Sequence, residues 1–150
     1  MTDVFSFGVL HLVGSGLTPD FAGLGVVFYT SLNHLPFLQL ASDSHVPKLP
    51  VVGSHEIATQ LLEVSRVQSC WHDGFHFVDM SKECLTHLAQ FVSPPLPEAG
   101  DFIPALTGAR LMTASLASLV EGIAHVGIIS NRRELLLFSG GKCVLAEKIA

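Results

Sequence analysis

The sequence predicts an α/β or α+β domain in which helices flank a mixed central β-sheet. Short apolar segments rich in Val, Phe, Leu and Ile recur along the chain and are bounded by Gly, Pro, Asn or Asp, as strands are. Two other stretches place their apolar residues at helical spacing. With 150 residues the chain is long enough to bury a core, and we expect a single domain over 1–150.

The first part of the chain is expected to supply three strands. Residues 4–13 form the longest apolar run and are interpreted as a buried strand. The short, β-branched segment "GLGVVFYT" predicts a strand over 24–30. A third, shorter strand is expected around 37–40, ahead of a loop that contains two prolines.

The middle of the chain predicts a helix and then a β-hairpin. Ser54 is the expected N-cap of the helix, and Glu56 would lie in its first turn. The apolar stripe of this helix consists of Ile57, Leu61 and Val64. Strands are expected over 75–80 and 85–92, joined by a polar turn, so the helix would pack on the sheet that they extend.

The last part of the chain predicts a second helix and three strands, after an irregular loop over 93–106 with four prolines. Thr107 is the expected N-cap, and the apolar stripe consists of Met112, Leu116, Leu119 and Ile123. Strands are expected over 124–130, 134–139 and 142–148. They are joined by the turn "NRR" and by a Gly-Gly hairpin turn.

The start of the second helix is a candidate anion site. Thr107, Gly108 and Ala109 have little bulk, so an anion could approach the free backbone N–H groups there closely. The helix dipole favours negative charge, and Arg110 adds a bidentate phosphate donor. The alternative is an ordinary capped helix with Arg110 in solvent.

A second candidate site lies in "WHDGF", residues 71–75, where the expected hairpin begins. Asp73 could bind a metal ion or accept a hydroxyl proton. Gly74 would let a ligand touch the backbone. The alternative is a simple Asp-Gly turn, which is a common arrangement.

Together the two motifs resemble the diadenylate cyclase family. Its members carry a D-G-A motif and, after a hairpin and a loop, a G-T-R-H-R motif that opens a helix. Here "DGF" at 73–75 and "TGARLMTA" at 107–114 stand in those places. The downstream "HVGIISNRRELLLFSGGKCV" also resembles the final strands of the family. The resemblance is clearest over 51–148.

The resemblance implies the family's fold and a nucleotide site. Family members condense two ATP molecules, with the help of a metal ion such as Mg or Mn. By resemblance, Asp73 would contact the metal or the ribose, Gly74 would contact the base side, and the segment around Arg110 would cradle phosphates. The residues that it places at the ligand are Asp73, Gly74, Phe75, Thr107, Gly108, Ala109 and Arg110.

Three positions depart from the family pattern. Leu111 and Met112 replace the histidine and the second arginine, and Ala109 replaces a threonine. Because one deleted donor costs roughly 2.7–4 kcal/mol of transition-state stabilisation, these losses predict a catalytically degenerate relative that binds a nucleotide or nucleotide-derived ligand as a sensor. One alternative is an active diadenylate cyclase that uses Asp73 and Arg110. Another is a structural or interaction domain without a small-molecule site.

The composition limits the partners and the compartment. A net charge of −5 with only eight Lys and Arg argues against nucleic acid as the main partner. No apolar run approaches the roughly 20 residues that a membrane helix needs, and no signal peptide is recognised. We therefore expect a cytoplasmic protein with reduced, mostly buried thiols. With 49% hydrophobic and 14% charged residues, self-association into a homo-oligomer is plausible.

Several other residues have two interpretations. Cys70, His72, His76 and Cys84 are close in sequence, but their spacing matches no zinc pattern, and we expect the strand histidines His76, His87 and His125 to be structural. His72 could contact a ligand, and Trp71 could either stack on a base or fill the core. Arg132 and Arg133 could add charge at the site or lie in solvent. Cys84 and Cys143 are expected in the core.

Overall fold

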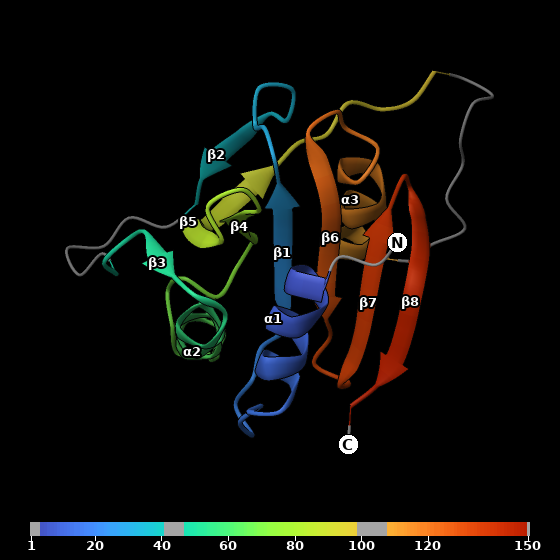
Figure 1. Cartoon of the computed structure of the whole chain (residues 1–150). Coiled ribbons are helices and arrows are strands. Elements are labelled where there is room, and N and C mark those ends of the chain that lie inside the picture. Colours follow the sequence, from blue (N-terminus) through green and yellow to red (C-terminus); the bar gives the residue numbers. More distant parts are fainter. Residues whose placement is uncertain (1–3, 41–46, 99–107, 150) are drawn as a thin grey trace.

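The structure, a computed structural model, describes residues 4–40, 47–98 and 108–149. Within these ranges three helices and eight strands follow one another in the chain (Figure 1). In order they are α1 (Val4–Gly14), β1 (Leu24–Tyr29), β2 (Phe37–Gln39), β3 (Val51–Val52), α2 (Ser54–Val64), β4 (Phe75–Asp79), β5 (Cys84–Val92), α3 (Ala109–Ala117), β6 (Ile123–Ile129), β7 (Glu134–Ser139) and β8 (Lys142–Lys148).

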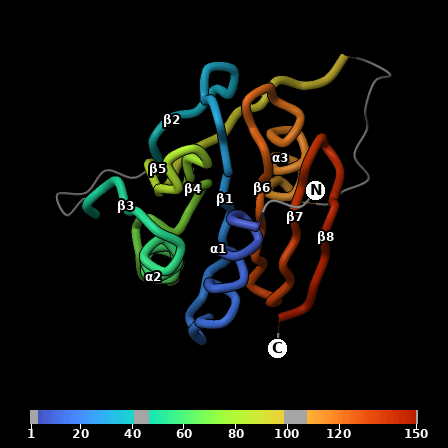
Figure 2. Tube along the Cα trace, viewed as in Figure 1, coloured from blue at the N-terminus to red at the C-terminus, as the bar shows by residue number. Residues whose placement is uncertain are grey.

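The strands form one mixed sheet, as the sequence predicted. The sheet order is β2-β5-β4-β1-β6-β7-β8, and the short β3 also pairs with β5. β1 runs parallel to β4, and the other pairs are antiparallel. The trace in Figure 2 shows how β1, from the start of the chain, comes to lie between β4 and β6. The α+β class with a mixed sheet flanked by helices is confirmed.

The sheet separates two cores. Helices α1 and α2 cover one face, and α3 covers the other (Figure 1). All six residues of β1 are buried, and they alternate between the two cores because strand side chains point to opposite faces in turn. Val26 and Phe28 pack beneath α1 and α2, whereas Val27 and Tyr29 pack beneath α3. β1 is therefore the central strand on which both layers rest.

The interpretation of residues 4–13 as a strand is wrong, because the segment forms helix α1. Its buried residues include Ser6, Val9, Leu10 and Val13, whose spacing is that of one helical face. The opposite face is also apolar, with Val4 almost fully exposed, so the contrast that reveals helical periodicity is missing. Three helices are therefore present in the described residues, where the sequence had predicted two.

The two predicted helices form, but their ends differ from the expectation. Gly53 and Gly108 are the N-caps, each with φ 98°, and neither helix start has a side-chain cap. Ser54 is thus the first helical residue rather than the cap, and Thr107 lies outside the described residues. The stripe in α2 is buried as predicted. Helix α3 ends at Ala117, so Leu119 is exposed beyond it and Ile123 opens β6.

The remaining strand predictions are confirmed within a residue or two. β1, β2, the β4–β5 hairpin and the strands β6 to β8 lie where the sequence placed them, and Gly140 and Gly141 form the last hairpin turn. The two-residue strand β3 was not predicted. Part of the proline-rich segment, 99–106, falls outside the described residues.

Candidate functional site

The site lies where β1 and β4 begin. Their parallel register aligns Val26 with His76, so Gly23, just before β1, and Asp73, two residues before β4, come to the same end of the sheet. β6 runs antiparallel to β1 and aligns Ile129 with Leu24, which brings its carboxyl end to the same place. Helix α3 also begins at this end of the sheet. The topology therefore brings together two turns that are more than 30 residues apart in sequence.

One cavity joins the two candidate motifs. A cleft of about 280 Å³ is lined by Asp73, Gly74 and Phe75 from one motif and by Ala109 and Arg110 from the other. Its remaining walls are Leu40, Gln90, Phe91, Val92 and Thr113. Gly108 caps α3 beside it but is not a lining residue. We call this cavity the nucleotide cleft, after the ligand that the resemblance to diadenylate cyclases leads us to expect there.

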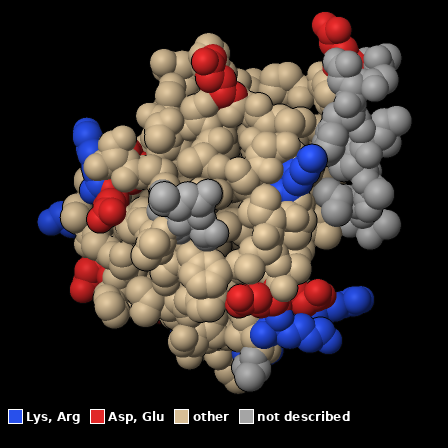
Figure 3. All heavy atoms as spheres, turned by 45° about the vertical axis from the view of Figure 1, so that its right-hand side comes forward, with Lys and Arg blue, Asp and Glu red and all other residues tan. Residues whose placement is uncertain are grey.

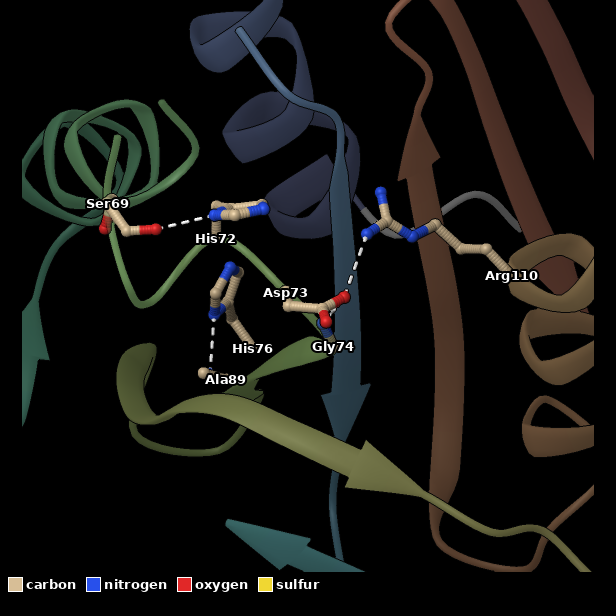
Figure 4. A network of polar contacts seen from close by, with 7 residues as sticks. All are labelled: Ser69, His72, Asp73, Gly74, His76, Ala89 and Arg110. Atoms are coloured by element: carbon tan, nitrogen blue, oxygen red, sulfur yellow. Dashed lines mark hydrogen bonds and ion pairs between the residues drawn. The ribbon is translucent and has the colours of Figure 1, made fainter. Parts of the chain in front are cut away.

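Arg110 reaches across the start of β1 toward Asp73 (Figure 4). Its Nη2 lies 3.9 Å from Asp73 Oδ1, which also accepts a hydrogen bond of 2.9 Å from the Gly74 backbone N–H. The Arg110 side chain is 31% exposed and that of Asp73 is 76% exposed. Burial lowers the pKa of the Arg110 guanidinium, and the Asp73 charge opposes that shift. A long pair with one exposed partner is weak, so an incoming anion can replace Asp73 as the partner of Arg110.

Two glycines give the site its shape. A Cβ on Gly74, which has φ 76°, would lie 2.5 Å from the backbone oxygen of Gln90, so the start of β4 can approach β5 only without a side chain. A Cβ on Gly23, with φ 108°, would lie 2.7 Å from Arg110 Nη1. Gly23 therefore leaves the space that the guanidinium occupies.

The contact between Gly23 and Arg110 can be tested with a matched glycine. Gly23→Ala and Gly53→Ala both place alanine at a positive φ, at a cost of about 1–3 kcal/mol each in unfolding free energy. A methyl group on Gly53 meets no atom within 4 Å, whereas one on Gly23 must displace the flexible end of Arg110. We expect similar losses of melting temperature from both variants and weakened anion binding from Gly23→Ala alone. Equal binding by both variants would contradict this assignment.

A second cavity shares Arg110 as a wall. It measures about 620 Å³ and is lined by the β6–β7 turn and by the α3 side of the sheet. The lining residues besides Arg110 are Ala22, Leu111, Ile128, Ser130, Asn131, Arg132, Glu134 and Leu136. Of the two turn arginines, Arg132 is among these residues and Arg133 is not. Leu111 also packs against the core beneath α3. We call this cavity the turn cavity.

His72 and His76 make contacts within the protein that are consistent with structural roles. The His72 ring Nδ1 lies 2.6 Å from the Ser69 carbonyl, and His72 does not line the nucleotide cleft. His76 is fully buried in β4, and its Nδ1 accepts a hydrogen bond of 3.0 Å from the Ala89 backbone N–H (Figure 4). His76 Nε2 is buried without a hydrogen-bond partner. Burial first, and then the charges of Arg110 and His72, lower the pKa of His76 to about 3.

The remaining candidates have structural places. Within the described ranges, no group of three or more His, Cys, Asp or Glu side chains could hold a metal ion. Trp71 is buried in the core beneath α1 and α2, as the packing interpretation expects. Cys84 is buried, but Cys70 and Cys143 are exposed, so the expectation of a core position for Cys143 is wrong. β8 is an edge strand with one neighbour, and most of its side chains face solvent.

Sequence reasoning missed half of the lining of the cleft. Gln90 belongs to it because the β4–β5 register pairs it with Phe75, so the hairpin prediction contained the signal. Phe91 and Val92 follow from the same register. Leu40 had no sequence signal, since its position depends on the order of the strands, and the same holds for Gly23, which lies beside Arg110 without lining the cleft.

Solved structures with the same fold include a diadenylate cyclase. No protein-family model matches the sequence, and none of the curated proteins matches it. A double mutant of DacA from Staphylococcus aureus, a diadenylate cyclase, superposes with a TM-score of 0.56 at 17% identity, over 97% of this chain and 86% of that chain.

A hypothetical membrane spanning protein from Bacillus cereus superposes with a TM-score of 0.57 at 17% identity, over 97% of this chain and 61% of that one. This chain thus spans less than two thirds of the length of that protein. At these identities the likeness shows a diadenylate-cyclase-like fold. Among the helices that the structure describes, none is both long and apolar enough to pass through a membrane.

Proposed function

We propose that this chain is a catalytically degenerate diadenylate-cyclase-like domain that binds a nucleotide or nucleotide-derived ligand as a sensor. One observation carries the proposal: Asp73 and Arg110, from two turns distant in the sequence, line the same cleft. The motifs that contribute them are those that resemble the D-G-A and G-T-R-H-R motifs of the family. The fold is also that of a diadenylate cyclase.

The lining of the cleft suits the two ends of a nucleotide. Phe75 and Val92 are buried walls, and the exposed Leu40 and Phe91 stand beside them. This apolar end can hold a base, since aromatic and aliphatic walls with a few polar groups are typical of small-molecule sites. Arg110 lines the same cleft and can donate two parallel hydrogen bonds to a phosphate.

The residues that line the cleft are too poor in positive charge to favour catalysis. Among the described lining residues of the nucleotide cleft, Arg110 is the one cation. The next side chain, Leu111, is apolar and packs toward the core. Condensation of two triphosphates needs several positive groups around the phosphates, and each missing donor costs roughly 2.7–4 kcal/mol in the transition state. Binding needs fewer positive groups than catalysis does, because one charge-assisted contact already contributes roughly 1.5–3 kcal/mol.

A divalent metal ion would depend on the nucleotide. Asp73 is the one carboxylate among the described residues that line the nucleotide cleft, and it is largely exposed. Mg²⁺ and Mn²⁺ take oxygen ligands, and Mg²⁺ sites are often completed by substrate phosphates and water. Asp73 fits one position in such a shell, so a metal would arrive together with phosphate groups.

The proposal predicts ligand binding without turnover. Purified protein with saturating nucleotide should show a higher melting temperature, since a ligand at about 100 times its Kd adds about 2.7 kcal/mol to the unfolding free energy. Incubation with ATP and Mg²⁺ or Mn²⁺, followed by chromatography of the products, should show unchanged ATP. Accumulation of cyclic dinucleotide would establish the enzyme instead. Absence of any melting shift across a nucleotide panel would favour a structural or interaction domain.

A further inference from the structure

The charges that line the two cavities limit how many phosphates the ligand can carry. This argument rests on the proposed nucleotide function of the same site. Arg110 lines both cavities, and Arg132 lines the turn cavity. Each cavity also has one carboxylate, Asp73 in the nucleotide cleft and Glu134 in the turn cavity. Among the described lining residues, arginines and carboxylates are therefore equal in number, and the walls bring no excess positive charge.

The surroundings of the site add little positive charge. The chain has only eight Lys and Arg against thirteen Asp and Glu. On the face shown in Figure 3, charged side chains are few, and where Lys and Arg gather at its lower right they lie beside Asp and Glu. A highly charged anion would thus gain its attraction from Arg110 and Arg132 alone among the described lining residues, and it would be repelled by the two carboxylates.

The position of the carboxylates determines whether the site favours a ligand with one phosphate or one with three. A phosphate next to Arg110 takes the place of Asp73, a partner that is exposed and 3.9 Å away. Arg110 is also a wall of the turn cavity, so further phosphates that extend past it into that cavity would meet Glu134 and Arg132. There each added negative charge meets a carboxylate as well as an arginine, so it gains little. Near neutral pH a phosphate monoester carries a charge of about −1.5 to −2, which one guanidinium can hold.

The size of the nucleotide cleft agrees with a small ligand. Its volume of about 280 Å³ is near the lower limit of about 300 Å³ for small-molecule sites. The apolar end is open on one side, because the side chains of Leu40 and Phe91 are 48% and 50% exposed. A planar base can lie against these side chains, with a single anion at Arg110. We infer that the site prefers a nucleoside monophosphate to the corresponding triphosphate.

The test compares matched nucleotides without metal ions. We expect isothermal titration in EDTA to give AMP and GMP a Kd at least about threefold lower than that of ATP and GTP, a preference that corresponds to about 0.7 kcal/mol. Adenosine should bind at least about tenfold more weakly than AMP, because it lacks the charge-assisted contact with Arg110. A triphosphate that binds as tightly as its monophosphate, or adenosine that binds as tightly as AMP, would overturn the inference.

A charge-neutral variant locates the cause of the preference. Glu134→Gln should lower the Kd of ATP about threefold or more and change that of AMP less, because it removes the carboxylate from the turn cavity. Glu121→Gln is the matched control, since Glu121 is 84% exposed and pairs with His34 instead. An unchanged ATP-to-AMP ratio in Glu134→Gln would overturn the inference.

The same experiment separates this inference from the proposed function. If triphosphates bind more tightly than monophosphates, the nucleotide site stands and only the preference for one phosphate is wrong. If neither the monophosphates nor the triphosphates bind to the wild-type protein, with or without Mg²⁺, the proposed function is wrong and this inference falls with it.

Discussion

Arg110→Ala is expected to remove most of the nucleotide-induced rise in melting temperature while leaving the ligand-free protein almost as stable as wild type. The guanidinium is the one cation among the described residues of the nucleotide cleft, and loss of its charge-assisted contact should weaken binding by about 1.5–3 kcal/mol, roughly ten- to a hundredfold. In the ligand-free protein its partner Asp73 is exposed and 3.9 Å away, so the lost ion pair costs less than about 1 kcal/mol.

Thermal unfolding with and without ligand separates the two roles of Arg110. At about 100 times the wild-type Kd, the ligand adds about 2.7 kcal/mol in wild type and about 0.4–1.4 kcal/mol in the variant, which is at most about half. Arg66→Ala is the matched control, because Arg66 pairs with Asp20 at 3.0 Å and does not line the nucleotide cleft. If Arg110→Ala lowers the ligand-free melting temperature as much as the liganded one, Arg110 is a structural residue and the proposed site is wrong.

Much of the fold was predictable because its patterns are local. The strand segments 24–30 and 134–139 are short, apolar and bounded by turns, and α2 has a clear apolar stripe. The prediction of a strand over 4–13 was wrong because the helix there is apolar on nearly every side, so composition could not separate a buried strand from a buried helix. The N-cap predictions were wrong for another reason. The sequence favoured a hydroxyl side chain at the starts of α2 and α3, but the backbone there has a positive φ that glycine adopts easily.

The site was predictable to the extent that it consists of turns. Asp73 and Arg110 stand out as polar residues at the ends of elements, and the family resemblance related them to one ligand. Their shared cleft depends on the parallel pairing of β1 with β4, which a single sequence does not reveal. Gly23 belongs to the site for the same reason: it lies next to Asp73 through the strand order and contacts Arg110 across the start of β1.

His76 is expected to make the protein sensitive to acid. In the folded state its pKa is about 3, against 6.5 for an ordinary histidine, because the ring is fully buried and lies near Arg110 and His72. Between these two pH values the unfolded chain binds more protons than the folded one. The free energy of unfolding therefore falls as the pH is lowered from 6.5 toward 3, by at most about 1.4 kcal/mol per pH unit from this group. Above pH 6.5 its contribution is constant.

Chemical unfolding at a series of pH values measures this slope. His76→Gln should be less stable at neutral pH, because the Ala89 N–H loses the acceptor that it has in the wild type. Its stability should nevertheless fall less steeply between pH 6.5 and 4, since the titrating group is gone. His34→Gln is the control, because it removes a histidine whose ring is more than half exposed beside Glu121 and leaves His76 in place. Equal slopes in all three proteins would remove His76 as the cause.

Protonation of His76 is also expected to affect the walls of the nucleotide cleft. The ring accepts a hydrogen bond from the N–H of Ala89, which has φ 53° (Figure 4). The Ala89 carbonyl accepts a hydrogen bond of 2.9 Å from the Leu40 N–H. Leu40 and Phe75, the latter adjacent to His76 in β4, are both walls of the cleft. A proton on the buried ring would break the first link of this chain, because His76 Nδ1 could no longer accept. Because the pKa of His76 in the folded protein is about 3, this link stays intact until the pH approaches 3, by which point most of the stability that this group contributes is already lost.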